Sequence, residues 1–282
     1  MSNIVITSDS TCDLSPELRQ RYNVTTLPLG VTLGGKVYKD GVDITPDDIY
    51  AHHDKTGELP KTTAANVDEF YNFFKDFVDE GKTVIHFDIS SKMSSTFNNA
   101  RIAAEELGNV YVIDSANLST GIGLLVIAAA EMVNEGLEAE KIVENINALV
   151  PKVDVTFVID NLEYLYKGGR CSALAAFGAN MLNLKPCIEV KDGAMGVCKK
   201  YRGKYADVLK TYVSERLGDG SNIDDSRIFV THAGCDEEVV KQVVEQVKAT
   251  GIFKEVFLTR AGCTVSSHCG ADTLGVLFIR KN

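Results

Sequence analysis

The sequence predicts an α/β protein of two domains, in which an α/β/α domain with a parallel sheet precedes an α+β domain with a mixed sheet. In the first half, short strand-like runs alternate with helix-like runs, the order expected of a parallel sheet covered by helices on both faces. The second half is richer in strands, and their order is mixed. The chain has 282 residues, 45% of them hydrophobic, which suffices for one large or two medium domains. We place the boundary near residues 151–155, so that the domains comprise residues 1–153 and 154–282.

Local signals mark the elements of the first half. Ser15-Pro16-Glu17 combines a capping residue with a proline in the first helical turn. Gly34-Gly35 indicates the turn of a β-hairpin. Phenylalanines recur at helical spacing within residues 67–80. In chain order, the expected elements are strand 4–7, a helix from residue 15, strand 24–29, a hairpin over 31–38, helices 46–53 and 67–80, strand 83–89, helix 97–107, strand 110–113 and helices near 121–135 and 139–150.

The second half contains more strands. Asp192-Gly193 lies between two strand-like runs and predicts an antiparallel pair. The expected elements are strand 156–159, an alanine-rich helix over 174–184, strands 187–190 and 195–200, helix 206–217, strand 228–231, helix 237–249, and strands 256–258 and 274–279.

Composition excludes several classes of protein. The net charge of −10 argues against nucleic-acid binding, which needs a basic face, and requires local donors for any bound anion. The longest apolar stretch, residues 121–130, is too short to span a bilayer, and no signal peptide opens the sequence. We therefore expect a cytoplasmic protein. The seven cysteines form no C-x-x-C pair, and their scattered spacing indicates reduced core or loop residues, not a disulfide framework or a zinc site.

A hydroxyl-rich loop, residues 90–96, lies between a buried strand and a helix. Free N–H groups and the positive end of the helix dipole make such a loop an anion site. It contains no obvious acid, base or activated nucleophile, which favours holding an anion over transforming it. Residues 8–11, 114–120 and 61–63 are also rich in hydroxyls or strand-end aspartates. Any one loop can simply cap a helix or brace a turn, but several at one sheet edge favour a shared polar pocket.

Three further residues are candidates for ligand contact. His268 lies in a polar, glycine-containing segment, which we expect to be a loop, where a histidine serves equally well as a structural residue or a ligand contact. Arg170 and Arg202 each adjoin a glycine, and a guanidinium suits a carboxylate or a phosphate as well as a solvated surface. The sequence has no P-loop, complete dinucleotide fingerprint or nucleophile elbow.

Several longer motifs resemble those of one known family. They are residues 7–14, residues 161–170 with the alanine-rich run after them, Leu184-Lys185-Pro186, Tyr201-Arg202-Gly203, and residues 267–270 with 274–276. Together they cover essentially the whole chain, which resembles the DegV family. That family contains the fatty-acid-binding subunits of bacterial fatty acid kinase.

The resemblance implies a two-domain protein that buries a long-chain fatty acid between its domains. No further cofactor, metal or catalytic residue is implied. The residues matching those that hold the carboxylate are Thr62, Thr63, Ser94, Ser95 and His268. Arg170 and Arg202 match partner-facing positions related to phosphotransfer. A separate ATP-dependent kinase subunit would phosphorylate the presented carboxylate to an acyl phosphate, and transient membrane contact would allow lipid exchange.

Apolar residues of the second half are candidates for lining an acyl tunnel, although each serves equally well in an ordinary core. They are Leu174, Phe177, Met181, Leu182 and Leu184. Burying one methylene is worth about 0.8 kcal/mol, so a long acyl chain would supply most of the affinity.

The sequence departs from the family pattern at three places. Thr62-Thr63-Ala64-Ala65 stands where Thr-Ser-Gln-Pro is usual, and Ser95 replaces a glycine. Ala271 and Asp272 follow Gly270 in place of proline and glycine, which predicts a carboxylate near the head group.

Three functions follow as hypotheses. The first is a carrier that presents a fatty acid to a kinase subunit. The second is a stand-alone phosphotransferase or hydrolase acting on a small anion, and the third is a regulatory module that senses lipid.

Overall fold

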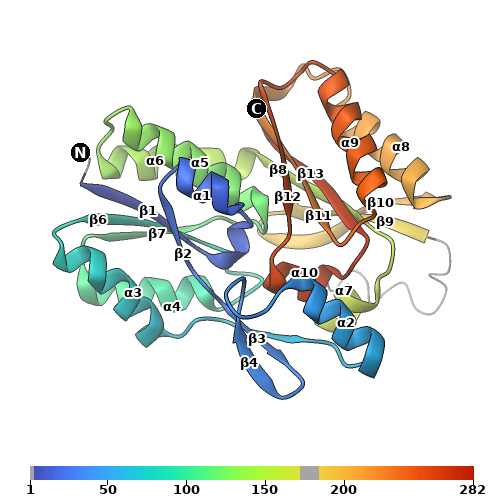
Figure 1. The fold of residues 1–282 in the computed structure, drawn as a ribbon. Coiled ribbons are helices and arrows are strands. Elements are labelled where there is room, and N and C mark those ends of the chain that lie inside the picture. The colour runs from blue at the N-terminus through green and yellow to red at the C-terminus, as the bar shows by residue number, and fades with distance from the viewer. Residues whose placement is uncertain (1–2, 172–183) are drawn as a thin grey trace.

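The computed structural model describes residues 3–171 and 184–282, whose strands form three sheets (Figure 1). The first sheet has four strands in the order β2-β1-β6-β7, and all neighbours are parallel. These strands are β1 (Ile4–Asp9), β2 (Val24–Leu27), β6 (Thr83–Asp88) and β7 (Val110–Asp114). The parallel sheet predicted for the first half is thereby confirmed.

Helices cover both faces of this sheet. Figure 1 shows α3 and α4 on one face and α1, α5 and α6 on the other. Their bounds are α1 (Pro16–Arg21), α3 (Val67–Asp79), α4 (Thr96–Leu107), α5 (Thr120–Asn134) and α6 (Ala139–Leu149). The phenylalanine spacing holds in α3, where Phe70 and Phe74 are fully buried. Asn66 and Glu69 form a capping box that fixes the start of this helix.

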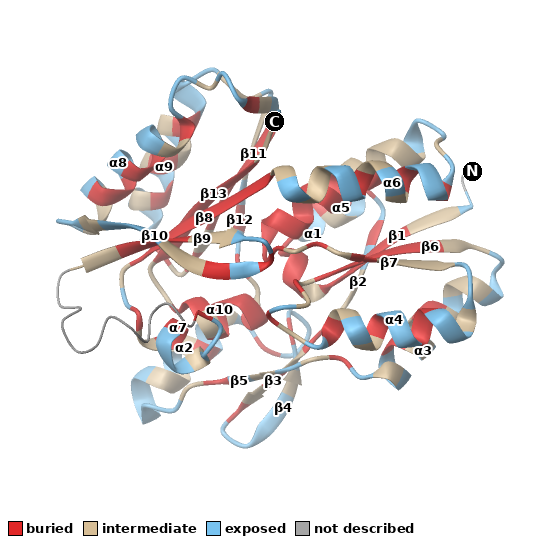
Figure 2. Ribbon diagram, turned by 180° about the vertical axis from the view of Figure 1, so that it is seen from behind, coloured by how far each residue is buried: buried red, intermediate tan, exposed pale blue. Residues whose placement is uncertain are grey.

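The second sheet has six strands in the order β10-β9-β8-β13-β11-β12. They are β8 (Val153–Ile159), β9 (Leu184–Lys191), β10 (Ala194–Arg202), β11 (Ile223–Ala233), β12 (Glu255–Arg260) and β13 (Thr273–Arg280). Only the β11–β12 pair is parallel, so the sheet is mixed, as the sequence predicts. Helices α8 (Tyr205–Leu217) and α9 (Glu237–Ala249) cover its outer face, with their buried sides toward the strands (Figure 2).

A small third sheet joins the two larger parts. The predicted hairpin forms β3 (Gly30–Leu33) and β4 (Lys36–Lys39), with Gly34 and Gly35 at positive φ in the turn. Strand β5 (Lys61–Thr63), which the sequence did not reveal, pairs with β3. Helix α2 (Pro46–Thr56) connects β4 to β5, and two short 3₁₀ turns cover Ser10–Cys12 and Val150–Lys152.

Two short helices were not foreseen, α7 (Glu163–Gly168) and α10 (Cys263–Cys269). The loop expected around His268 is wrong, because His268 lies on α10. The cysteines, threonine, valine and serines of α10 are weak helix formers, so local propensity does not reveal the helix. Tertiary contacts stabilise it instead. The Asp40 carboxylate accepts the first N–H groups of α10, from Cys263 at 2.7 Å and Thr264 at 3.0 Å.

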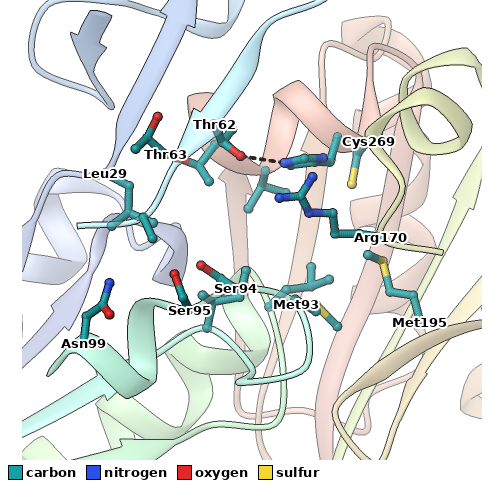
Figure 3. A pocket seen from close by; sticks show the side chains of 16 residues that line it. Leu29, Thr62, Thr63, Met93, Ser94, Ser95, Asn99, Arg170, Met195 and Cys269 are labelled. Atoms are coloured by element: carbon teal, nitrogen blue, oxygen red, sulfur yellow. Dashed lines mark hydrogen bonds between the residues drawn. The ribbon is translucent and has the colours of Figure 1, made fainter. Parts of the chain in front are cut away.

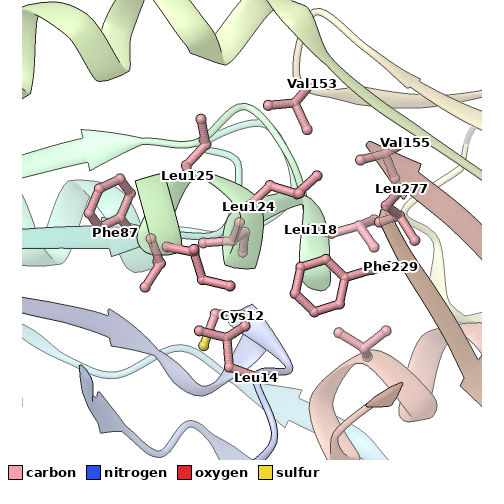
Figure 4. Close-up of a cluster of buried hydrophobic side chains, with 14 of the residues drawn as sticks. Cys12, Leu14, Phe87, Leu118, Leu124, Leu125, Val153, Val155, Phe229 and Leu277 are labelled. Atoms are coloured by element: carbon pink, nitrogen blue, oxygen red, sulfur yellow. The ribbon is translucent and has the colours of Figure 1, made fainter. Parts of the chain in front are cut away.

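The two large sheets share one hydrophobic core. Figure 4 shows Phe87, Leu124 and Leu125 in the same cluster as Val155 and Leu277 of the six-stranded sheet. Helix α5 lies between the sheets and is buried nearly all round, consistent with its uniformly apolar sequence.

Residue 153, where we divide the chain, begins the first strand of the second sheet. The division into two domains stays a prediction. The helix expected over residues 174–184 falls almost entirely outside the described residues. Among the described helices, none is long and apolar enough to cross a membrane.

Candidate functional site

A cavity of about 370 Å³ lies where the three sheets approach one another (Figure 3). Its walls come from β5, from the loop after β6 with the start of α4, from α10, and from single residues of other segments. The lining residues are Leu29, Thr62, Thr63, Ala64, Ile89, Met93, Ser94, Ser95, Asn99, Leu118, Arg170, Met195, Thr264, Val265, His268 and Cys269. All five residues predicted to hold an anion lie among them. Of the three hydroxyl-rich loops expected at the edge of the parallel sheet, only residues 90–96 contribute hydroxyls to the cavity; residues 8–11 do not line it, and residues 114–120 contribute only Leu118.

The loop of residues 90–96 is braced from several sides. The Ser90 hydroxyl donates to the Gly193 carbonyl at 2.7 Å, across to the turn between β9 and β10. Carboxylates at strand ends hold the backbone of the loop. Asp9 accepts from the Ile89 N–H at 2.9 Å, and Asp114 accepts from the Ser91 N–H at 3.2 Å. These two aspartates thus brace the loop, as strand-end aspartates commonly do.

Ser94 and Ser95 present hydroxyls at the start of α4, facing Thr62 and Thr63 across the cavity (Figure 3). The Ser94 hydroxyl lies 2.6 Å from the Thr96 hydroxyl and accepts from the Thr96 N–H at 3.2 Å. Ser95 is the N-cap residue of α4, but its side chain makes no capping hydrogen bond. Its φ of −77° and ψ of −3° are ordinary helical values. No glycine is required at this position, so the serine adds a hydroxyl without backbone strain.

His268 contacts Thr62 at the wall of the cavity. Its Nε2 lies 2.8 Å from the Thr62 hydroxyl oxygen (dashed line in Figure 3). Burial, with a smaller effect from the Arg170 cation, lowers the pKa of His268 to about 4. The imidazole is therefore neutral at pH 7. Its Nδ1 is buried and has no hydrogen-bond partner within the part of the chain that the structure describes. On that side the ring packs so closely against Gly168 that an added Cβ would lie 2.6 Å from Nδ1.

Arg170 supplies positive charge beside the histidine. It follows Gly169, whose φ of 70° ends α7 in the left-handed conformation. The exposed Arg170 guanidinium donates to the Gly168 carbonyl at 2.7 Å and lies on the Thr62 side of the cavity (Figure 3). Arg202, the other predicted partner-facing arginine, is also exposed, at the end of β10. It does not line the cavity.

The rest of the lining is largely apolar. It includes Leu29, Ile89, Met93, Leu118, Met195 and Val265. Leu118, Val265 and Cys269 also line a small adjoining pocket of about 30 Å³, which continues toward Val155, Phe157 and Leu277 between the two large sheets. The cavity is thus amphipathic, because hydroxyls, an imidazole and a guanidinium line it together with apolar side chains.

Four of the five predicted tunnel residues lie outside the described residues. They are Leu174, Phe177, Met181 and Leu182. Leu184 is half-buried at the start of β9 and is not among the residues that line the cavity. Their role in a tunnel stays a prediction.

Sequence reasoning missed most of the apolar wall, and it also missed Asn99. Apolar side chains have the same signature in a core and in a cavity wall, so nothing in the sequence separates them. Asn99 did have a signal, because it follows Ser95 by four residues and so shares its helix face. Its side-chain amide donates to the Ala65 carbonyl at 2.8 Å, which ties α4 to the segment after β5.

The carboxylate expected beside the head group is not there. Asp272 lies at the turn before β13 with a φ of 54°, and it is not among the lining residues. Its charged neighbours are Asp160, Asp236 and Lys185. Burial, together with Asp160, raises the pKa of the Asp272 carboxyl. Asp272 therefore contributes nothing to the lining of the cavity, and the prediction is wrong.

Two buried aspartates position α10 and with it His268. Asp40 accepts from the N–H groups of Cys263 and Thr264, and Asp13 accepts from the Gly262 N–H at 2.8 Å. The Ser119 hydroxyl donates to Asp13 at 2.6 Å. Because the bonds from Asp13 and Asp40 to the start of α10 join segments more than 200 residues apart, no local pattern in the sequence predicts them.

A family model matches nearly the whole chain. The model described as "Uncharacterised protein, DegV family COG1307" matches residues 3–281. DegV domain-containing proteins of Caldanaerobacter subterraneus and Clostridium acetobutylicum are 31% and 33% identical, with 100% of each chain covered.

Solved structures share the fold. A DegV family protein from Thermus thermophilus, described by its fatty acid binding, superposes with a TM-score of 0.90 at 30% identity, covering 99% of this chain and 100% of that one. A stearic-acid-binding protein from Eubacterium ventriosum has a TM-score of 0.85 at 30% identity, covering 100% of this chain and 99% of that one. DegV of Bacillus subtilis, described as a fatty acid binding protein, has a TM-score of 0.85 at 25% identity, with 100% of both chains covered.

Proposed function

Because this chain belongs to the DegV family, we propose that its amphipathic cavity binds a long-chain fatty acid. The observation that carries the proposal is that hydroxyls, an imidazole and a guanidinium line one cavity together with apolar side chains, and that this cavity adjoins an apolar pocket between the two large sheets. The volume of about 370 Å³ falls within the range of small-molecule sites. Relatives of the same fold are described as fatty-acid-binding proteins.

The carboxylate is bound by hydroxyl donors. A neutral imidazole carries one N–H, and a proton on Nδ1 would leave a buried donor unpaired, at a cost of about 1–3 kcal/mol. With the proton on Nε2, His268 donates to the Thr62 oxygen. The Thr62 hydroxyl then donates onward into the cavity. Ser94 and Ser95 supply hydroxyls from the facing wall, and Arg170 lies near enough to balance the negative charge.

The hydrocarbon chain supplies most of the affinity. At about 0.8 kcal/mol for each buried methylene, ten methylenes contribute about 8 kcal/mol. A charge-assisted hydrogen bond contributes about 1.5–3 kcal/mol. The polar end therefore chiefly fixes the orientation of the ligand, and the chain extends past Leu118 and Val265 between the large sheets.

The bound carboxylate is presented to a separate ATP-dependent kinase subunit for conversion to an acyl phosphate. Support comes from the exposed Arg170 at the polar end and the exposed Arg202 at the end of β10, both available to a docking partner. In this role the chain binds and orients the substrate, and the kinase supplies the phosphoryl group.

The binding proposal is tested by identifying what copurifies. Denaturing extraction and mass spectrometry of the purified protein should release a long-chain fatty acid. Absence of lipid, together with failure of the delipidated protein to take up oleate or palmitate, refutes fatty-acid binding.

The kinase proposal has its own test. Acyl phosphate should form only when the loaded protein, ATP and a kinase subunit are all present. Turnover of ATP by the isolated chain would instead favour a stand-alone enzyme. Normal lipid binding with no response to any kinase subunit would favour a lipid sensor.

A further inference from the structure

Two cysteines lie on neighbouring strands at one edge of the six-stranded sheet, as far as the structure describes that sheet. Of the seven free cysteines, Cys198 alone is exposed. It lies on β10, the edge strand. Cys187 is buried on the adjacent strand β9, with only 2% of its surface exposed.

A β-bulge brings these two residues together. Val197 pairs with Ile188, and Lys199 pairs with Cys187, so Cys198 is the extra residue between two successive pairs. Its Sγ lies 3.4 Å from the Cys187 carbonyl oxygen. The Cys187 Sγ in turn lies 4.0 Å from the carbonyl oxygen of Ile188, the next residue of β9. Bulges re-aim a side chain, and here the re-aimed thiol lies against the backbone of the residue that carries the second thiol.

The two thiols differ in their readiness to ionise. Interaction with the Cys187 thiol lowers the pKa of Cys198 to about 7, and the Arg216 cation contributes in the same direction. Interaction with Cys198, together with burial, raises the pKa of Cys187. The accessible sulfur therefore ionises more readily than the buried one, which keeps its proton at neutral pH. This is the asymmetry of an attacking and a resolving cysteine.

We propose that Cys198 and Cys187 form a peroxide-reactive pair, in which Cys198 is oxidised first and Cys187 resolves it to a reversible disulfide. The Cys198 thiolate attacks one oxygen of hydrogen peroxide, so that an S–O bond forms, the O–O bond breaks and hydroxide leaves. The product is a sulfenic acid at Cys198, and the hydroxide takes a proton to become water.

The disulfide then forms between the neighbouring strands β9 and β10. The Cys187 sulfur attacks the Cys198 sulfur, the S–S bond forms, and the S–O bond breaks. The Cys187 proton leaves with the hydroxyl as a second water. Two thiols are oxidised by two electrons in all, and one peroxide is reduced to two waters.

The experiment uses the folded, full-length protein. It is reduced, freed of reductant, treated with one equivalent of hydrogen peroxide, blocked with N-ethylmaleimide and digested for mass spectrometry. We expect a peptide pair joined through Cys187 and Cys198 that dithiothreitol separates. If the folded protein yields no such pair, or yields it only after unfolding in urea, the proposal is overturned.

Three variants test the assigned roles. Cys187→Ser should leave Cys198 as a sulfenic acid that dimedone traps, and Cys198→Ser should abolish both the disulfide and the dimedone adduct. Cys235→Ser removes another buried thiol, whose Sγ lies 3.2 Å from the Thr273 carbonyl oxygen, and should form the disulfide like the wild type. A dimedone adduct on Cys187 in the Cys198→Ser variant contradicts the order of attack.

Discussion

Gly168→Ala should disable the His268 contact without altering any polar group of the site. A Cβ at residue 168 would lie 2.6 Å from His268 Nδ1, whereas unstrained contacts need roughly 3.5 Å. The ring has no simple retreat, because its other nitrogen already lies 2.8 Å from the Thr62 oxygen. It must either compress that hydrogen bond or rotate away from Thr62.

The size of the effect follows from the hydrogen bond that is lost. In the proposed site, Thr62 donates to a carboxylate only while His268 orients its hydroxyl. A hydrogen bond to a charged group is worth about 1.5–3 kcal/mol, so fatty-acid affinity should fall roughly 10- to 150-fold. Gly168 ends α7 and does not have a positive φ, so alanine suits its backbone. The free energy of unfolding should fall by only about 0.5–1.5 kcal/mol, because only the neutral hydrogen bond between His268 and Thr62 is lost.

Affinity is measured by calorimetric titration of delipidated protein with oleate. Gly196→Ala is the matched control, because nothing lies within 4 Å of its added Cβ and its φ is not positive. In a His268→Ala background, Gly168→Ala should have no further effect, since the pair acts through one contact. A folded Gly168→Ala protein that binds oleate within twofold of wild type refutes the reasoning.

Three further predictions concern the same region. Ser95→Ala should lower oleate affinity about tenfold in the same titration, by loss of one charge-assisted bond. Thermal unfolding should change little, because the Ser95 side chain makes no capping bond. In NMR titrations His268 should keep neutral chemical shifts down to its pKa of about 4, and a transition near 6.5 contradicts the buried environment. Burial, with repulsion from Asp88, raises the pKa of Asp9 to about 7. The folded state binds this proton more tightly than the unfolded state, so below pH 4 the raised pKa stabilises the fold by at most about 4 kcal/mol. This stabilisation is lost as the pH rises through 7. When the free energy of unfolding is measured in urea at several pH values, Asp9→Asn should weaken its dependence on pH. An unchanged pH dependence would come from other groups such as Asp13, whose pKa burial also raises.

Local signals predicted those elements that local interactions stabilise. The hairpin of β3 and β4 follows from Gly34-Gly35, and α3 follows from its phenylalanine spacing and its cap. Helix α10 could not be predicted in this way. Its sequence favours no helix, and carboxylates more than 200 residues away satisfy its first N–H groups.

The candidate site likewise has residues that the sequence reveals and residues that it does not. Its hydroxyls were visible because Ser94-Ser95-Thr96 lies between a strand and a helix, a place where hydroxyls either cap the helix or bind an anion. The apolar wall was hidden because Met93 or Leu118 is indistinguishable in the sequence from a core residue. The position of Asp272 was misjudged because its spacing from His268 in the sequence does not reveal the turn before β13, in which Asp272 has a φ of 54°.

A neutral donor set suits a carboxylate that must be both buried and released. A permanently charged partner deep in the cavity would carry its own desolvation cost and would bind the carboxylate as a buried ion pair, which is costly to separate. His268 is neutral at pH 7, so the inner donors carry no such charge, and the nearby cation, Arg170, is exposed. Affinity then resides mainly in the hydrocarbon chain, where it grows with length. In the proposed function, the head group can therefore be released toward a partner that contacts the exposed Arg170, while the chain keeps the ligand in place.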